Sequence, residues 1–271
     1  MNEIVTSHDN PTIKLIKSLK IKKYRDKHGL YMVEGIKMAR EALDQKINIH
    51  MLIFSEDFHI GELGLHEEEQ LIPNIRVASN LFKEVSDVQS PQGVIALLNK
   101  EEYPIDMIDS SGPSFWVVLD EVQDPGNMGT IIRTVDAAGG NGVILLKGCV
   151  DPYNPKTIRA TMGSIFRVPI IQVRDTGSFL NKLKEIASDI LVSSMDGKSI
   201  FNWKDSRSKG ITALVIGNES KGISEEVGQF ATDVVSIPIV GGAESLNASV
   251  AAGILIYEIM KKQGNIEQEN S

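Results

Sequence analysis

Polar side chains that could serve chemistry gather in three segments of this sequence. In the first, Asn127 and Arg133 follow an acidic Pro-Gly turn, and Arg133 is expected on the polar side of a helix. In the second, Glu219 stands in a glycine-bounded loop after an apolar run, where a covered carboxylate needs partners. In the third, Ser245 and Asn247 supply a hydroxyl and an amide that could cap a helix or bind a ligand.

The elements that must position these segments alternate between buried strands and helices. Apolar runs predict strands at residues 115–119, 143–146, 190–193, 214–216 and 234–237. Helical patterns fill the gaps at residues 127–138, 155–162, 177–187, 223–229 and 247–262. Continuous apolar strands of this kind are buried on both faces, which predicts an α/β fold with a parallel sheet. Such sheets bind ligands beyond the carboxyl ends of their strands, where the three segments would lie.

The first segment also has an ordinary explanation. Its helix is expected to begin near Asn127 and to end at Gly139-Gly140, with Ile131 and Val135 toward the core. Gly129 would lie one turn below Arg133 on the polar face and leave room for a partner's backbone. A solvated arginine on an unremarkable helix has the same pattern. In the other two segments, likewise, the glycines could be turn residues and Ser245 and Asn247 could be helix caps only.

Residues 1–100 predict a separate small α/β domain. A helix over residues 10–27, which Asn10 could cap, precedes strands and helices that alternate up to residue 98. Residues 99–113 are polar and contain two prolines, which is typical of a linker. The expected organisation is therefore a domain at 1–100, a linker at 101–114 and a second domain at 115–271.

The distribution of charge leaves a nucleic-acid partner open. The formal net charge is −8, but residues 1–40 hold nine lysines and arginines against four acids, and the acidic run Glu67–Glu69 comes later. Screening limits the reach of each charge to about 10 Å, so a local basic face can bind phosphates in an acidic protein. The candidate RNA contacts on the first helix are Lys14, Lys17, Lys20 and Lys22. A solvated helix face explains the same lysines.

Several other classes of site and location are disfavoured. There is no apolar run of about 18 residues and no secretory pattern at the start, so we expect neither a membrane span nor a signal peptide. Cys149 is the only cysteine, which excludes an intramolecular disulfide and favours the cytoplasm. All five histidines precede residue 70 without metal-ligand spacing, so no metal is expected. The phosphate-binding and dinucleotide-binding glycine patterns are absent.

The order of the three segments is more specific than any one of them. Asn127-x-Gly129-x-x-x-Arg133, then Ile216-Gly217-Asn218-Glu219-x-x-Gly222, then Ile237-Pro238-Ile239 leading to Ser245-Leu246-Asn247, resembles the three motifs of the SpoU (TrmH-type) RNA methyltransferases of the SPOUT superfamily. Arg159–Pro169 looks like the family's segment between the first two motifs, and residues 1–100 look more loosely like the ribosomal-protein-like substrate-binding domain of many members.

This resemblance implies 2′-O-methylation of an RNA ribose with S-adenosylmethionine as the methyl donor. The C-terminal part, about residues 190–262, would form a trefoil knot, which chain topology alone would not predict. It further implies a homodimer packed through the knotted region. The residues expected at the cofactor are Ile216, Gly217, Ile237, Ser245 and Leu246.

The resemblance also assigns the site residues. Arg133 would be the central catalytic residue, and because a guanidinium keeps its proton, we expect it to clamp an RNA phosphate rather than act as a base. Asn127 would bond Arg133 or the ribose, and Glu219 would pair with Arg133 or fix its own loop. Ser245 and Asn247 would order the third segment at the methyl donor.

The separate first domain favours 23S ribosomal RNA as the substrate, and so does the acidic C-terminal end, because tRNA-specific members usually carry basic terminal extensions. Three alternatives remain open at this point. The substrate could be a tRNA. The enzyme could be an rRNA methyltransferase that confers antibiotic resistance. The protein could also be a non-catalytic RNA-binding or ribosome-assembly factor.

Overall fold

The computed structural model describes residues 3–108, 113–204 and 210–264. The chain divides into two compact units, Met1–Glu101 with Tyr153–Phe166, and Glu102–Pro152 with Arg167–Ser271. The first unit thus includes a segment that follows much later in the sequence. Tyr103, Ile105 and Ile108, which lie in the predicted linker 101–114, pack on the core of the second unit. Residues 109–112 of that linker and the end of the chain after residue 264 lie outside the described residues.

The first unit is built on a mixed five-stranded sheet with the order β1-β4-β3-β5-β2. Its strands are β1 (Ile4–Val5), β2 (Leu30–Glu34), β3 (Ile49–Ser55), β4 (Asn74–Val77) and β5 (Val94–Asn99). Its helices are α1 (Pro11–Ser18), α2 (Lys22–His28), α3 (Ile36–Asp44), α4 (Ser79–Val85) and α6 (Pro155–Thr161), with short 3-10 turns at Ile60–Leu63, Glu69–Leu71 and Ser164–Phe166. Strand β5 runs antiparallel to β2 and β3, whereas β4 is parallel to β1 and β3.

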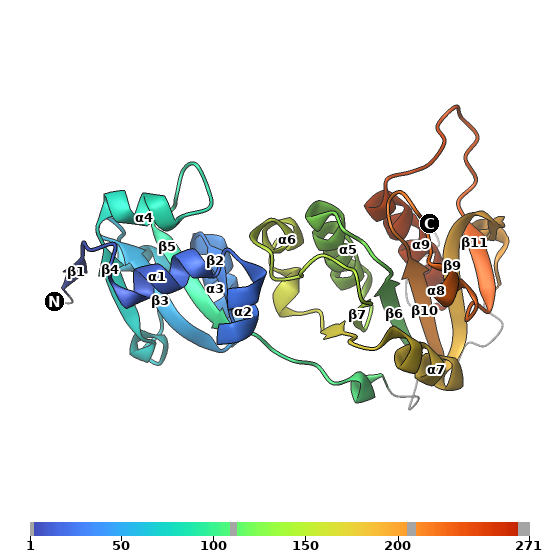
Figure 1. Cartoon of the computed structure of the whole chain (residues 1–271), viewed down its shortest axis with the longest axis horizontal. Helices are drawn as coiled ribbons and strands as arrows, with labels where there is room; N and C mark the ends of the chain where they lie inside the picture. Colours follow the sequence, from blue (N-terminus) through green and yellow to red (C-terminus); the bar gives the residue numbers. More distant parts are fainter. Residues whose placement is uncertain (1–2, 109–112, 205–209, 265–271) are drawn as a thin grey trace, which may run out of the picture. The chain divides into compact units, whose positions relative to one another are not determined.

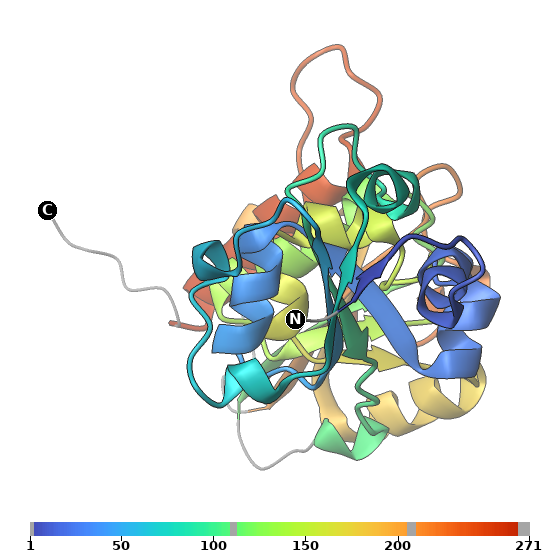
Figure 2. The same cartoon turned by 90° about the vertical axis from the view of Figure 1, so that its left-hand side faces the viewer.

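Helices cover both faces of this sheet. Ile13 and Ile16 of α1 and Phe82 of α4 form one buried cluster with strand residues such as Ile53 and Ile95. Helix α3 contacts β2 and β5. Figure 2 shows α1 and α4 on one side of the sheet and α3 on the other. The small α/β domain expected over the first hundred residues is therefore present.

The predicted single helix over residues 10–27 is wrong, because two short helices take its place. Asn10 caps α1 as expected, since its side chain accepts from the Thr12 N–H at 2.9 Å. Helix α1 stops at Ser18, and Ile21 is extended before α2 begins. Buried Arg25 donates to the carbonyl of Leu19 at 2.7 Å, which satisfies a carbonyl group at the end of α1.

The second unit contains a six-stranded sheet with the order β11-β9-β10-β6-β7-β8, and every pairing in it is parallel. The strands are β6 (Ser114–Leu119), β7 (Gly142–Leu145), β8 (Ile170–Gln172), β9 (Ala187–Ser199), β10 (Ile211–Ile216) and β11 (Asp233–Ser236). The helices are α5 (Pro125–Ala138), α7 (Thr176–Ile186), α8 (Glu225–Gly228) and α9 (Ala248–Lys262), with 3-10 turns at Ile105–Met107 and Ile200–Asn202. The predicted parallel α/β sheet is confirmed, although β8 was not predicted and β9 is much longer than residues 190–193.

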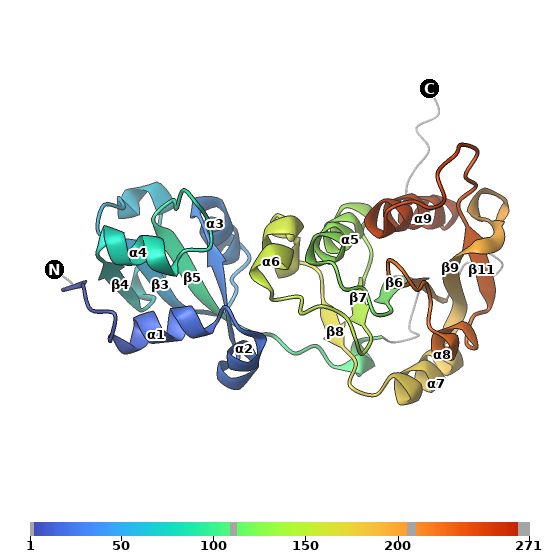
Figure 3. The same ribbon diagram turned by 45° about the horizontal axis from the view of Figure 1, so that its top comes forward.

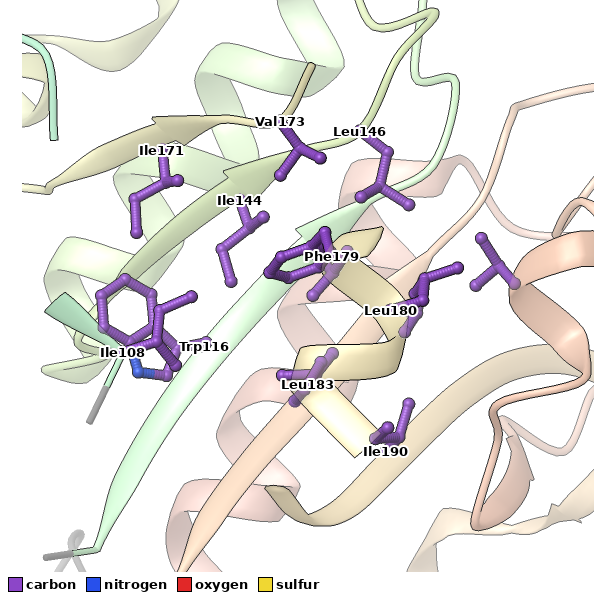
Figure 4. Close-up of a cluster of buried hydrophobic side chains, with 14 of the residues drawn as sticks. Ile108, Trp116, Ile144, Leu146, Ile171, Val173, Phe179, Leu180, Leu183 and Ile190 are labelled. Atoms are coloured by element: carbon purple, nitrogen blue, oxygen red, sulfur yellow. The ribbon is translucent and has the colours of Figure 1, made fainter. Parts of the chain in front are cut away.

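The core of the second unit fills the space between the sheet and α7. Alternate strand residues, among them Trp116, Ile144 and Ile190, meet Phe179 and Leu183 of α7 (Figure 4). The opposite face of the sheet is covered by α5, which contacts β7, and by α9, which contacts β10. Figures 1 and 3 show α5 and α9 next to each other and α7 and α8 away from them. The sheet is therefore buried on both faces, as its continuous apolar strands require.

Helix α5 differs from its prediction in two respects. It begins at Pro125, before Asn127, because Asp124 is its N-cap and accepts from the Asn127 N–H at 2.8 Å. Gly129 is buried, so the expectation that it lies on an open polar face is wrong. Helix α9 packs on α5, which therefore has a second covered side besides its sheet-facing side. Arg133 remains exposed, and α5 ends at Gly139 with a φ of 74°, close to the expected residue.

Candidate active site

A cavity of about 560 Å³ opens where β9, β10 and β11 end. The five residues expected at a cofactor all line it, namely Ile216, Gly217, Ile237, Ser245 and Leu246. They come from the carboxyl end of β10 and from the segment that joins β11 to α9. The volume is within the range of about 300–1,000 Å³ typical of small-molecule sites.

One wall of the cavity was not anticipated from the sequence. Val192 of β9 pairs with Val234, but the next pairing joins Lys198 to Val235, so the register shifts and the intervening residues leave the ladder. Ser193, Ser194 and Met195 from this bulge line the cavity. Their position directly after the buried run at residues 190–192 could have indicated that they line the cavity, because the loops after β10 and β11 also follow apolar runs and line it.

A chain of hydrogen bonds joins the three sequence motifs. The Asn127 side-chain amide donates to Oε1 of Glu219 at 3.0 Å, and the Asn247 amide donates to Oδ1 of Asn127 at 2.9 Å. These contacts connect positions 92 and 120 residues apart. The Asn127 side chain is buried and has both its donor and its acceptor satisfied. Asn127 is therefore the central residue of these hydrogen bonds and connects the second and third motifs to the first.

Glu219 is held by the first motif through further contacts. Its carboxylate accepts from the backbone N–H groups of Gln123 at 3.3 Å and Asp124 at 3.1 Å. Partial burial by itself raises the pKa of the Glu219 carboxyl, but the hydrogen bonds from Asn127 and from backbone N–H groups outweigh it, and the pKa lies below the ordinary 4.5. Glu219 is therefore an anion fixed by Asn127 and by the motif-one turn, the segment 121–124 that precedes α5.

Asn218 forms a second link between the loop after β10 and the turn before α5. Its amide donates to the carbonyl of Glu121 at 2.9 Å, while its Oδ1 accepts from the N–H groups of Ser220 and Lys221. Glu121 has a φ of 55°, a left-handed conformation that is uncommon for a residue with a side chain. The role of Asn218 was not predicted from the sequence, although asparagine in a glycine-rich loop is a usual signal for this kind of turn.

Arg133 is exposed on α5 and does not bond either predicted partner. Asn127 bonds Glu219 and Asn247, while Glu219 is bound by Asn127 and by the motif-one backbone. Within the described part of the chain, the guanidinium of Arg133 has neither an ion pair nor a hydrogen bond. The Glu219 carboxylate is bound instead by the turn before α5 and by Asn127.

Asn247 and Ser245, the predicted residues of the third motif, have different surroundings. Asn247 caps α9, accepting from the N–H groups of Ser249 at 2.9 Å and Val250 at 3.3 Å, so its role as a cap coexists with its bond to Asn127. Ser245 is exposed at the cavity, where Lys221 and Glu244 also contribute opposite charges. The cavity thus combines apolar walls with several serine hydroxyls, a cation and two carboxylates.

The lysines expected to contact RNA lie on the first unit. Lys14 pairs with Asp9 at 2.8 Å, Lys17 lies 3.4 Å from Glu84, and Lys20 pairs with Asp87 at 2.8 Å. Lys22 is exposed at the start of α2. Three of the four cations are therefore partly neutralised by neighbouring acids.

The described residues contain neither a metal-binding cluster nor a membrane-spanning helix. In that part of the chain, no group of three or more histidine, cysteine, aspartate or glutamate side chains is arranged to hold a metal ion. None of the helices described is both long enough and apolar enough to cross a membrane.

Comparisons with known proteins give a consistent result. Residues 114–257 match the SpoU rRNA Methylase family, and residues 10–96 match the MRM3-like substrate binding domain. The chain is 29% identical over 255 residues to the Bacillus subtilis 23S rRNA (guanosine(2553)-2′-O)-methyltransferase RlmP, in a match that covers 94% of this chain and 98% of that protein. It is 31% identical to the mitochondrial rRNA methyltransferase 3A of Danio rerio, over 92% of this chain and 68% of the relative.

Solved structures resemble the whole chain as well. The AdoMet-bound rRNA methyltransferase from Sinorhizobium meliloti superposes with a TM-score of 0.86 at 31% identity, covering 98% of this chain and 99% of that one. The SpoU methyltransferase AviRb from Streptomyces viridochromogenes, in complex with AdoMet, gives 0.83 at 25% identity over 95% of this chain and 100% of that one. With the family match spanning more than half the sequence, this chain belongs to the SpoU rRNA Methylase family and is an S-adenosylmethionine-dependent RNA methyltransferase.

Proposed function

We propose that this enzyme methylates the 2′-hydroxyl of one ribose in 23S ribosomal RNA. The observation that carries the proposal is the hydrogen-bonded chain Glu219–Asn127–Asn247, which joins all three family motifs at the edge of one cavity. The RlmP relative is named for 2′-O-methylation of 23S rRNA, and AviRb and the Danio rerio protein also have rRNA or SpoU methyltransferase names. The match of residues 10–96 to a substrate binding domain supports a role for the first unit in holding the RNA.

The residues at the cavity fit S-adenosylmethionine. Ile216, Ile237 and Leu246 offer apolar surface for the adenosyl group, and the main chain at Gly217 leaves no side chain in the way. Lys221 and Glu244 supply charges of the signs that the methionyl carboxylate and ammonium need. When bound, the cofactor supplies an electrophilic methyl group on a sulfonium. The protein must then position the RNA hydroxyl and assist loss of its proton.

Arg133 is the residue we assign to the RNA at this step. A guanidinium keeps its proton in proteins and has no free acceptor, so it is poorly suited to take a proton. It is well suited to hold a phosphate, because its planar fork donates two parallel hydrogen bonds. The exposed guanidinium, with no partner among the described residues, is available for a phosphate beside the target ribose. Such a clamp orients the hydroxyl and, by placing a cation near it, stabilises its anionic form.

The hydrogen-bonded chain has a positioning role in this proposal. Glu219 fixes the motif-two loop to the motif-one turn, and Asn247 fixes the start of α9 to Asn127. Because Asn127 and Arg133 share α5, the same helix holds Glu219 and Asn247 in place and carries the clamp. Ser245 stands on the segment between β11 and α9, where we assign it to ordering that segment at the methyl donor.

We also propose that the enzyme is a homodimer with a knotted C-terminal region. Helix α9 follows β11 at one edge of the sheet yet packs on β10 and α5, so the segment between them must cross back over the strand ends. Val250 and Tyr257 on α9 are 51% and 45% exposed, an apolar surface suited to a second copy. With its single cysteine, the chain is suited to the cytoplasm, where we expect it to meet ribosomal RNA.

The proposed function is tested by mapping 2′-O-methyl groups in total RNA from cells with and without the gene. One missing 2′-O-methyl position in 23S rRNA, restored by the purified enzyme, is the expected result. A missing methyl group in tRNA instead would contradict the substrate assignment. If no position is lost, and if S-adenosylmethionine gives no increase in the melting temperature, the chain is a non-catalytic RNA-binding factor. Loss of resistance to a ribosome-targeting antibiotic in the deletion strain would identify a resistance enzyme.

A further inference from the structure

Arg167 and Asp136 form an ion pair that the three family motifs do not include. The Nε and Nη2 atoms of Arg167 lie 3.0 Å and 2.7 Å from the same oxygen of Asp136. The two side chains are only 34% and 23% exposed, so the pair is more shielded from water than most surface ion pairs. Both residues belong to the second unit, and 31 positions separate them in the sequence.

The position of Asp136 on α5 gives this pair its significance. It follows Arg133 by three residues, and side chains at that spacing are neighbours on a helix surface. An acid so placed would ordinarily pair with the arginine. Arg133 nevertheless has no ion pair within the described part of the chain, whereas the Asp136 carboxylate is bound by Arg167.

The local charge depends directly on Arg167. Arg133 and Asp136 alone would sum to zero, while Arg133, Asp136 and Arg167 together leave one positive charge on this face of α5. Neighbours on one helix face lie within the screening length of about 10 Å, so a phosphate approaching Arg133 experiences all three. The whole chain carries −8, which makes a locally positive surface more important for meeting RNA.

We infer that Arg167 is a positioning residue for the reaction, because by binding the Asp136 carboxylate it keeps the neighbouring Arg133 free for an RNA phosphate. The inference rests on the proposed function of Arg133 as the phosphate clamp. Arg167 acts through Asp136 and need not touch the RNA itself. Without Arg167, the carboxylate is released to compete with the phosphate for Arg133 and to repel it.

The test combines single and double variants. Methylation kinetics and cofactor affinity are measured for Arg167→Ala, Asp136→Asn and the double variant, using 23S rRNA purified from a strain that lacks the gene. For Arg167→Ala we expect the RNA KM to rise about three- to tenfold, as for a change of one charge near a phosphate, with unchanged affinity for S-adenosylmethionine. Asp136→Asn should not raise the RNA KM, because it removes the competing carboxylate and leaves both Arg133 and Arg167 positive. The double variant should return to about the parent value, because Arg133 alone again leaves one positive charge.

Rescue of the RNA KM is the decisive outcome when the melting temperature and the S-adenosylmethionine affinity of Arg167→Ala match those of the parent, because a merely structural role of Arg167 would lower these as well. If the double variant is as impaired as Arg167→Ala, the inference is overturned, and direct contact between Arg167 and RNA becomes the explanation. Should Arg167→Ala fail to fold, Arg167→Gln is compared with and without Asp136→Asn by the same criterion. An active Arg133→Ala enzyme would instead overturn the clamp itself, which separates failure of the proposed function from failure of this inference.

Discussion

The Asn127 amide donates to Glu219 at 3.0 Å across 92 residues of sequence. Asn127 also accepts from Asn247 at 2.9 Å, so one buried side chain connects the first motif to both others. An asparagine suits this place because it offers a donor and an acceptor on the same planar group. Neither an aspartate nor a leucine of similar size could satisfy both neighbours at once.

Asn127→Asp should therefore destabilise the protein more than Asn127→Ala does. In Asn127→Asp a second carboxylate faces Glu219, and the donor that stabilises the Glu219 anion is missing. In Asn127→Ala each neighbour has one hydrogen bond fewer, at a cost of about 1–3 kcal/mol of unfolding free energy. We expect both variants to bind S-adenosylmethionine weakly by isothermal titration calorimetry, and the aspartate variant to have the lower melting temperature. Equal melting temperatures of the two variants would contradict the bonding pattern.

The lowered pKa of Glu219 predicts a pH dependence on the acid side. A carboxyl whose pKa is lower in the folded chain contributes stability above its ordinary value of 4.5 and loses that contribution as the pH falls through the folded value. The contribution is at most about 1 kcal/mol, because water screens this partly exposed group. The unfolding free energies of the parent and Glu219→Gln should thus differ near neutral pH and converge below 4.5.

Denaturant titrations at several pH values measure that difference. Glu244→Gln is the matched control, since Glu244 also lines the cavity but has no hydrogen bond among the described residues. We expect its stability to follow that of the parent protein at each pH. A Glu219→Gln curve that stays parallel to the parent curve through the acid range would show that the carboxylate is not held by these donors.

Much of the fold could be predicted because apolar runs and turn residues depend on interactions between residues close together in the sequence. The parallel sheet of the second unit follows from strands such as Phe115–Leu119 and Leu214–Ile216, whose residues are apolar on both faces. The break after Ser18 was missed because the apolar spacing of Ile13, Ile16 and Leu19 continues a helical pattern beyond the point where the helix stops. Tertiary contacts such as the bond from Arg25 to the Leu19 carbonyl leave no periodic signal.

The candidate site was predictable in its members but not in its connections. The family motifs indicated Asn127, Glu219 and Asn247, whereas their order in the hydrogen-bonded chain depends on three loops meeting in space. The burial of Gly129 was missed for a related reason, because no pattern within α5 indicates that α9 packs on it. The bulge at Ser193–Met195 depends on a shift in strand register, which is set by pairing between distant strands.

If Arg133 clamps an RNA phosphate, its replacement should slow methyl transfer without weakening cofactor binding. Arg133→Ala should lower the rate on 23S rRNA by more than about tenfold, equivalent to roughly 1.4 kcal/mol of activation free energy. S-adenosylmethionine should still raise the melting temperature of the variant as it does for the parent, because Arg133 is not among the residues that line the cavity. Arg133→Lys keeps the charge but not the planar fork and should have intermediate activity. An alanine variant with more than about a tenth of the parent rate would refute the clamp.

The backbone at Gly217 predicts a strict requirement for glycine. A Cβ atom there would lie 2.4 Å from the carbonyl carbon of Gly222 and 2.6 Å from the nitrogen of Ile223, so the motif-two loop must move. We expect Gly217→Ala to lower S-adenosylmethionine affinity by at least about tenfold and to cost roughly 1–3 kcal/mol of unfolding free energy, as overpacking does. Gly228→Ala is the control, because a Cβ on Gly228 meets no atom within 4 Å. Cofactor affinity at the parent level in Gly217→Ala would show that this loop does not shape the site.

The lysines of α1 and α2 give the last prediction, which concerns how RNA is held. Because Lys14, Lys17 and Lys20 already have acidic neighbours, each phosphate contact must compete with an existing ion pair. Exposed pairs contribute only about 0–1 kcal/mol, so a phosphate can displace the acid. Neutralising these three and Lys22 to glutamine should weaken RNA binding, and the slope of log affinity against log salt should fall by about 0.7–0.9 for each phosphate that no longer meets a lysine.

A matched control separates specific contacts from a change in overall charge. The four substitutions Lys182→Gln, Lys184→Gln, Lys198→Gln and Lys261→Gln remove the same charge from the second unit, and Lys182 and Lys198 likewise have acidic partners. If the α1–α2 lysines contact phosphates, the first set lowers both affinity and salt slope more than the control set does. Equal reductions in the two sets would mean that RNA responds to the net charge alone, and these lysines would then have no specific role in RNA binding.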